Sequence, residues 1–454
     1  MKQPPRWREV LLNLLLLALV ATSMLLSVRI WHPDPLFGEA DTAEPSVQLQ
    51  PPPTVREMPE VFRPMRVSIR DGDGGWAEVH AGSSIYSTLW RLIRQAITGL
   101  DVGSGPVLVS RVPDLSEAGP SLQIHLPVSL MVSEWAELWQ WQASALRNGS
   151  MWVDRLTIIL GEPAGIYLSG PPGFDLYLGD LPEDQRQVLA DRLQQLDPSL
   201  FRPYRSLALE DLGLTALPDV VVPELTVVPG ARVSVSMPDQ REEEARYFPD
   251  LSVVRQIDER DARSLTDGQR LLRITNTGLL QFRTADATAD EEAPRLDRAL
   301  EIARQWVGSR GGWPQDLVLR RYVREEQRGR LEFGVSTGWD YPVESLPGAV
   351  QVQVSAAQRV VYFERTPTVQ NVTFDGEPVE IITPETALAH ALPAAPVLKT
   401  EPIREMYLTY LLKPASDGSG RWVADPTWVI QAGDTLIYIH AVASEHPRPP
   451  RVVR

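Results

Sequence analysis

The sequence predicts an α+β protein with one N-terminal transmembrane helix, a mixed α+β first domain and two similar ββαββ modules with antiparallel sheets. Three observations lead to this class. An uncharged apolar segment lies near the start of the chain, and helical and strand-like hydrophobic periods alternate beyond residue 60. The order strand, strand, helix, strand, strand then occurs twice after residue 236.

The composition is that of a globular protein divided into several domains. The chain has 454 residues, of which 43% are hydrophobic and 23% charged, and this length favours about two to four domains. It contains no cysteine. Disulfides, thiolate metal sites, a cysteine nucleophile and acylation of a cysteine are therefore excluded together.

The N-terminal apolar run is long enough to cross a membrane. Leu11 to Val28 form 18 residues without a charge, or about 27 Å of helix. Trp7 and Trp31 flank the run, and the basic residues that precede it are Lys2, Arg6 and Arg8. This pattern predicts a retained helix over 11–30, with residues 1–10 in the cytoplasm and the rest of the chain outside it. The alternative is a cleaved signal peptide, which has the same polarity but a shorter apolar core.

The charge of the remaining chain argues against nucleic acid as a partner. The formal net charge is −15, and residues 1–10 carry three basic side chains against Glu9, or +2, which leaves −17 for the rest. A surface of this sign repels phosphate backbones, so we expect no nucleic-acid binding.

A proline-rich stalk separates the expected helix from the first domain. Residues 31–60 hold seven prolines among polar residues, a composition that stays extended and builds no core. Residues 61–236 are predicted to form the first extracytoplasmic domain, with helices around 85–97 and 135–141, strands at 154–161 and 165–170, and a helix that begins near Pro182.

The two predicted modules follow at 237–345 and 346–454. In the first, a hairpin over 268–284 with its turn at Asn276–Gly278 precedes a helix from Leu296 and a hairpin that starts at Leu317. In the second, a hairpin over 349–365 precedes a helix that begins at Thr383 and a final hairpin. The repeated order predicts that the modules superpose, although two short α+β units can also match by chance.

Three motifs in register resemble one known family. They are YFPDLSVVRQIDERD from Tyr247, LTDGQRLLRI from Leu265, and GGWP at Gly311–Pro314. Their order and spacing are similar to those of the YycH family, membrane-tethered extracytoplasmic regulators of Gram-positive bacteria. The resemblance is clearest over 247–314 and again over 422–430, while residues 61–235 match only in the order of their elements.

The resemblance implies a regulatory function in cell-wall metabolism. Proteins of the YycH family act with a paired relative, YycI, on the sensor histidine kinase WalK, and the contact is thought to involve the transmembrane helices. The expected partners are therefore a WalK-like kinase, a YycI-like protein and the membrane. The two C-terminal modules of such proteins are alike and resemble the single YycI domain.

The residues themselves predict no catalytic, cofactor or metal site. The six histidines form no pair at helical metal-binding spacing, and Asp71-Gly-Asp73 lacks the remaining ligands of a calcium loop. Neither a phosphate-binding loop nor a serine nucleophile motif occurs. Clustered acids such as Glu242 and Glu244 are typical of solvated faces, and Trp135, Trp139 and Trp141 are expected in a core more than on a carbohydrate platform. We therefore expect no enzymatic activity; a cell-wall enzyme and a passive scaffold or ligand-binding module remain the alternatives.

One face of the predicted transmembrane helix is the candidate partner-binding site. At 100° per residue, the polar residues Asn13, Ser23 and Ser27 lie on one side together with Val20 and Met24, and Leu16 and Leu17 lie between them. Helices associate in lipid through such residues. In the alternative interpretation, the serines bond to their own helix and Asn13 reaches the interface.

Overall fold

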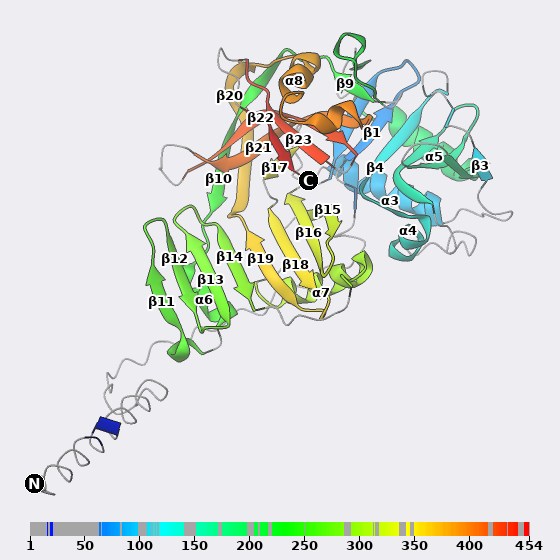
Figure 1. Ribbon diagram of the computed structural model, residues 1–454. Coiled ribbons are helices and arrows are strands. Elements are labelled where there is room, and N and C mark those ends of the chain that lie inside the picture. Colours follow the sequence, from blue (N-terminus) through cyan, green and yellow to red (C-terminus); the bar gives the residue numbers. More distant parts are fainter. Residues whose placement is uncertain are drawn as a thin grey trace, which may run out of the picture. The chain divides into compact units, whose positions relative to one another are not determined.

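The computed structural model describes most of the chain beyond residue 62 (Figure 1). The described residues are 16, 19, 20, 63–64, 66–81, 84–98, 107–109, 112–113, 115, 118–139, 151–170, 175–197, 204–207, 209–216, 220–248, 250–285, 292–311, 313, 317–335, 342–345, 349–415, 421–433, 435–443 and 449–453. The chain divides into two units, Met1–Gln48 and Leu49–Arg454.

A seven-stranded antiparallel sheet forms the N-terminal part of the second unit, in the order β2-β1-β4-β5-β6-β7-β3. Its strands are β1 (Arg66–Arg70), β2 (Trp76–His80), β3 (Val107–Val109), β4 (Ser121–Met131), β5 (Trp152–Ile159), β6 (Gly165–Ser169) and β7 (Asp175–Gly179). The helices of this part are α3 (Ser84–Thr98), α4 (Val132–Leu138) and α5 (Glu183–Gln194).

Helix α3 forms because its apolar residues recur with the helical period. Tyr86, Leu89, Ile93 and Ile97 are buried, and they follow one another at intervals of three or four residues. The opposite face carries Arg91 and Arg94, which are exposed. The helix therefore covers the core with one side and shows cations on the other.

An eight-stranded antiparallel sheet forms the central part, in the order β11-β12-β13-β14-β19-β18-β16-β15. Its strands are β11 (Arg255–Asp258), β12 (Ala262–Thr266), β13 (Arg270–Thr275), β14 (Leu280–Thr284), β15 (Leu317–Arg324), β16 (Arg328–Val335), β18 (Val350–Ser355) and β19 (Val360–Arg365). Helix α7 (Leu296–Gly308) packs on this sheet, and α6 (Gln240–Tyr247) precedes it with Asp239 as N-cap. The apolar residues of the N-terminal and central sheets form one continuous core.

The C-terminal part has its own core and a five-stranded sheet in the order β17-β21-β22-β23-β24. The strands are β17 (Val343–Ser345), β21 (Ile403–Pro414), β22 (Trp422–Ala432), β23 (Thr435–His440) and β24 (Arg451–Val453), and β17 is parallel to β21. A long ribbon of β10 (Val227–Ser236) and β20 (Thr368–Glu380) joins this core, as do β9 (Val221–Pro223) and α8 (Pro384–Ala391). Strand β8 (Tyr204–Ser206) pairs with β9.

The predicted α+β class with antiparallel sheets is confirmed, but the strands are not divided into two ββαββ modules. The hairpin β18–β19, expected to open the C-terminal module at 346, pairs with β16 and β14 of the central sheet. Strand β10, expected in the first domain, pairs with β20. The physical reason is that the hydrophobic period of a sequence indicates a strand and its turn, but not the distant strand with which it pairs. The edge strands β14 and β16 of the two central hairpins can each pair with another apolar strand.

The expected transmembrane segment lies almost entirely outside the described residues. Of residues 11–30 the structure describes Leu16, Leu19 and Val20, which are helical and exposed. Within the described part of the chain, no helix is both long and apolar enough to cross a membrane.

Candidate functional site

Buried charges meet where strands of all three sheets come together. We call this group the junction cluster; it consists of Arg66, Glu78, His125, Arg320, Glu344, Glu405, Tyr407 and Tyr438. Most of its members line a cavity of about 70 Å³. Its residues come from β1, β2, β4, β15, β17, β21 and β23, so the tertiary fold alone assembles it.

The pair of Glu344 and Arg320 forms the most deeply buried half of the junction cluster. The Glu344 side chain is 1% exposed, and its Oε2 lies 2.7 Å from Arg320 Nη2. Tyr407 Oη donates a hydrogen bond of 2.8 Å to the other carboxylate oxygen, and Arg320 donates one of 3.0 Å to Tyr438 Oη. Burial alone would lower the pKa of Arg320, but the Glu344 carboxylate and the tyrosines outweigh it and hold this pKa well above its ordinary value.

The other half of the junction cluster links the N-terminal sheet to β21. Arg66 forms an ion pair with Glu405 and another with Glu78, with an Nη1–Oε1 distance of 2.5 Å in the second. The Arg66 guanidinium also lies 4.5 Å from the ring centroid of Tyr407. His125 Nδ1 lies 3.1 Å from Glu405 Oε1. Burial, together with nearby Arg66 and Arg155, lowers the pKa of His125 well below its ordinary value.

The geometry of the junction cluster favours a structural role, in which it links the sheets, over a catalytic one. A catalytic pair of carboxylates needs at least one that is free to take up or release a proton at a substrate. Glu344 and Glu405 are each held by an arginine from a different sheet. Among the described residues, no group of three or more histidines and carboxylates could hold a metal ion.

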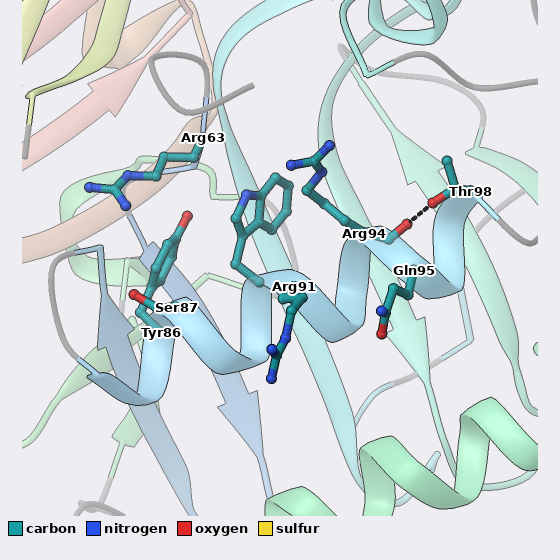
Figure 2. Close-up of a pocket in the computed structure, with 8 residues that line it drawn as sticks. Arg63, Tyr86, Ser87, Arg91, Arg94, Gln95 and Thr98 are labelled. Carbon is teal, nitrogen blue, oxygen red and sulfur yellow. Dashed lines mark hydrogen bonds between the residues drawn. The ribbon is translucent and has the colours of Figure 1, made fainter. Parts of the chain in front are cut away.

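A second, open groove of about 410 Å³ runs along α3 (Figure 2). Its lining includes Arg63, Tyr86, Arg91 and Arg94 and, among the described residues, no carboxylate. Figure 2 shows Arg94 and Thr98 on one side of the helix, with Arg91 directed to the other side. Tyr86 Oη donates a hydrogen bond of 2.5 Å to the carbonyl of Pro64. Because Arg91 and Arg94 diverge, they do not converge on one ligand.

The residues of the predicted partner-binding face lie mostly outside the described part. Asn13, Ser23, Met24 and Ser27 are not described, and Val20 is helical and 47% exposed. The face therefore stays a prediction.

Other motifs of the sequence have structural places. Trp135 and Trp139 are buried in the core, as expected. Asp71 accepts hydrogen bonds from the backbone N–H groups of Asp73 and Gly75 within the turn between β1 and β2. Trp313 in the GGWP motif donates to the carbonyl of Arg304 in α7, which fixes the turn that follows this helix.

The sequence did not reveal the junction cluster. Its charged members lie in strands that are far apart in the chain, and none belongs to a motif. The available signal was an acidic residue next to apolar strand positions, such as Glu405 before Met406 and Tyr407, which indicates a buried ion pair without naming its partner.

The described structure is an α+β fold with three large sheets, and a solved structure with a similar fold exists. No protein-family model matches the chain, and no curated protein sequence matches it. The crystal structure of YycH from Bacillus subtilis is similar with a TM-score of 0.57 and 16% identity, covering 87% of this chain and 99% of that one. The chain therefore has a YycH-like fold, and the resemblance read from the sequence motifs is confirmed at this level.

Two other solved structures are similar only at a low level. An uncharacterized protein from Eubacterium rectale gives a TM-score of 0.29 at 11% identity, covering 52% of this chain and 87% of that one. The C-terminal domain of YpeB from Bacillus megaterium gives 0.26 at 12%, covering 48% and 99%.

Proposed function

We propose that this chain is a membrane-anchored extracytoplasmic regulator that modulates a WalK-like sensor histidine kinase by protein–protein contact, together with a YycI-like protein. The observation that carries the proposal is the YycH-like fold, which extends over 99% of the YycH chain from Bacillus subtilis. The N-terminal run of 18 uncharged residues supports the anchor, and the acidic remainder of the chain supports a partner other than nucleic acid.

The junction cluster supports a binding function over a catalytic one. Its carboxylates are neutralised by arginines of neighbouring sheets and are not presented to a substrate. Ion pairs of this kind fix the position of the sheets that they join, which suits a protein that presents a constant surface to a partner.

The test measures kinase output while the proposed partner-binding face is changed. The full chain and the kinase are reconstituted together in nanodiscs, and kinase autophosphorylation is followed with and without the chain. The variant replaces Asn13, Ser23 and Ser27 by leucine, which keeps the helix apolar but removes its polar face. We expect the wild-type chain to change the autophosphorylation rate, and the triple variant to lose most of this effect and of its association with the kinase.

The matched control is the double variant Ala18→Leu and Thr22→Leu on the opposite side of the same helix, which should keep the effect. A replacement of the whole helix by an unrelated one distinguishes a regulator from a scaffold, because a scaffold tolerates the exchange. A chain that leaves the kinase unchanged in every form contradicts the proposed function. An unchanged effect in the triple variant contradicts only the role of the helix face.

A further inference from the structure

A groove of about 560 Å³ lies beside helix α7 on the central sheet. We call it the α7 groove; its charged and aromatic lining consists of Arg270, Arg298, Trp306, Arg310, Arg359 and Phe282. The arginines come from strand β13, from both ends of the α7 region, and from the turn between β18 and β19. Among the described residues, its lining contains no carboxylate, although the chain has a net charge of −15.

Three of the four groove arginines have no carboxylate as an ion-pair partner in the described structure. Arg298 Nε and Nη2 both donate to the neutral Gln358 Oε1, at 2.9 and 2.6 Å. Arg310 lies 4.2 Å from the ring centroid of Trp306 and donates to Ser309 Oγ. Arg359 is exposed. Arg270 alone is neutralised, by Asp267 at 2.6 Å.

Among the groove arginines, Arg310 is the one whose charge is least favourable in the absence of a bound anion. Its Nε is buried and makes no hydrogen bond within the described structure. Burial also lowers the pKa of Arg310. Arg310 is partly buried, and a guanidinium that is partly removed from water without a counterion is unfavourable, so an anion in the groove gains a charge-assisted hydrogen bond at this side chain.

We infer that the α7 groove binds a phosphate-bearing anion, either a soluble phosphate ester or the headgroup of an anionic lipid. The planar donor fork of arginine matches the oxygens of phosphate, and three cations without a carboxylate ion-pair partner in the described structure suit a group that carries more than one negative charge. The volume is that of a small-molecule site, and Trp306, Ile302 and Phe282 provide an apolar wall for the organic part of the ligand. This inference does not depend on the proposed regulation of a kinase.

The test titrates the full chain, in non-ionic detergent at low ionic strength, by isothermal calorimetry. The probes are inorganic pyrophosphate, dihexanoyl phosphatidylglycerol below its micelle concentration, and citrate, a carboxylate of similar charge. We expect at least one phosphate probe to bind more tightly than citrate. Stronger binding of pyrophosphate assigns the site to a soluble phosphate, and stronger binding of the lipid assigns it to a headgroup.

The decisive variant is Arg298→Ala with Arg359→Ala, which removes two cations at exposed positions. We expect it to weaken binding of the phosphate probe by about tenfold or more, because each arginine supplies a charge-assisted hydrogen bond. The matched control, Arg91→Ala with Arg94→Ala, removes the same charge from the α3 groove and should change binding by less than about twofold. Equal losses in both variants, equally tight citrate binding, or no binding of either phosphate probe to the wild-type chain would overturn the inference.

Discussion

The junction cluster and the α7 groove both depend on arginines, but they use them in opposite ways. In the junction cluster, Arg66 and Arg320 are each paired with a carboxylate from another sheet. In the α7 groove, Arg298 and Arg359 face solvent without such a partner. An arginine that is paired with a carboxylate stabilises the fold, whereas an arginine without such a partner is available to a ligand. The partner of an arginine, more than the arginine itself, therefore indicates its role.

Desolvation explains the contrast. A charge that leaves water costs several kcal/mol unless a partner compensates it, so arginines inside the fold are found with carboxylates. Arg298 and Arg359 at the α7 groove are exposed, so they keep most of their hydration and need no partner within the chain. Removal of a charge should therefore affect stability strongly at the junction cluster and weakly at the groove.

The largest effect is expected for Glu344→Gln. The glutamine is similar in size but uncharged, so the buried Arg320 loses its counterion and Tyr407 loses a charged acceptor. We expect the free energy of unfolding to fall by about 3–5 kcal/mol, measured by urea denaturation at neutral pH. The control is Glu344→Leu combined with Arg320→Met, which removes both charges and should cost much less. A loss below about 1 kcal/mol for the single variant would show that water replaces the carboxylate.

An intermediate effect is expected from His125 as the pH falls. Its pKa in the folded protein lies well below 6.5, owing to burial and to the cations of Arg66 and Arg155, whereas the unfolded chain takes up the proton near pH 6.5. The stability that comes from neutral His125 is thus complete above this pH and is lost as the pH falls below it. Between pH 7.5 and 5.5 the loss should be about 1.4 kcal/mol.

The comparison of wild type with His125→Gln isolates this contribution, because the carboxylates that do not contact His125 keep the same surroundings in both proteins. Urea denaturation across the same pH range should show a steeper decline for the wild type. Parallel profiles would mean that the Glu405 carboxylate, 3.1 Å from Nδ1, keeps His125 protonated in the folded state despite its burial.

Local elements of this fold could be predicted from sequence, whereas the pairing of distant strands could not. The hairpin of β13 and β14 has its turn at the predicted Asn276–Gly278, and α8 begins at the predicted position, with Thr383 as its N-cap. Both features are encoded within a few residues. Strand β4 was missed, although its Leu122, Ile124 and Leu126 alternate as a strand requires, because a helical pattern on each side dominated the assignment.

The same limit applies to the charged sites. The partner of Glu344 is fixed by the parallel pairing of β17 with β21 and by the position of β15, neither of which has a local sequence signal. The cations of the α7 groove are separated by up to 89 residues, the interval from Arg270 to Arg359, and no spacing rule connects them. Charge patterns along one helix are visible in a sequence, but charge patterns across sheets need the fold.

The smallest effect on stability is expected for the groove variant Arg298→Ala with Arg359→Ala. Arg359 has no ion-pair partner in the described structure, and Arg298 bonds only to the exposed side chain of Gln358. Arg298 also lies in the first turn of α7, where a cation opposes the helix dipole and alanine has the higher helix propensity. The loss of the hydrogen bonds to Gln358 destabilises the variant, whereas the removal of the cation and the helix propensity of alanine stabilise it. We therefore expect the free energy of unfolding to change by less than about 0.5 kcal/mol in urea denaturation. A loss comparable to that of Glu344→Gln would place both arginines among the contacts that hold the fold, and weaker phosphate binding in the same variant could then no longer be attributed to the groove.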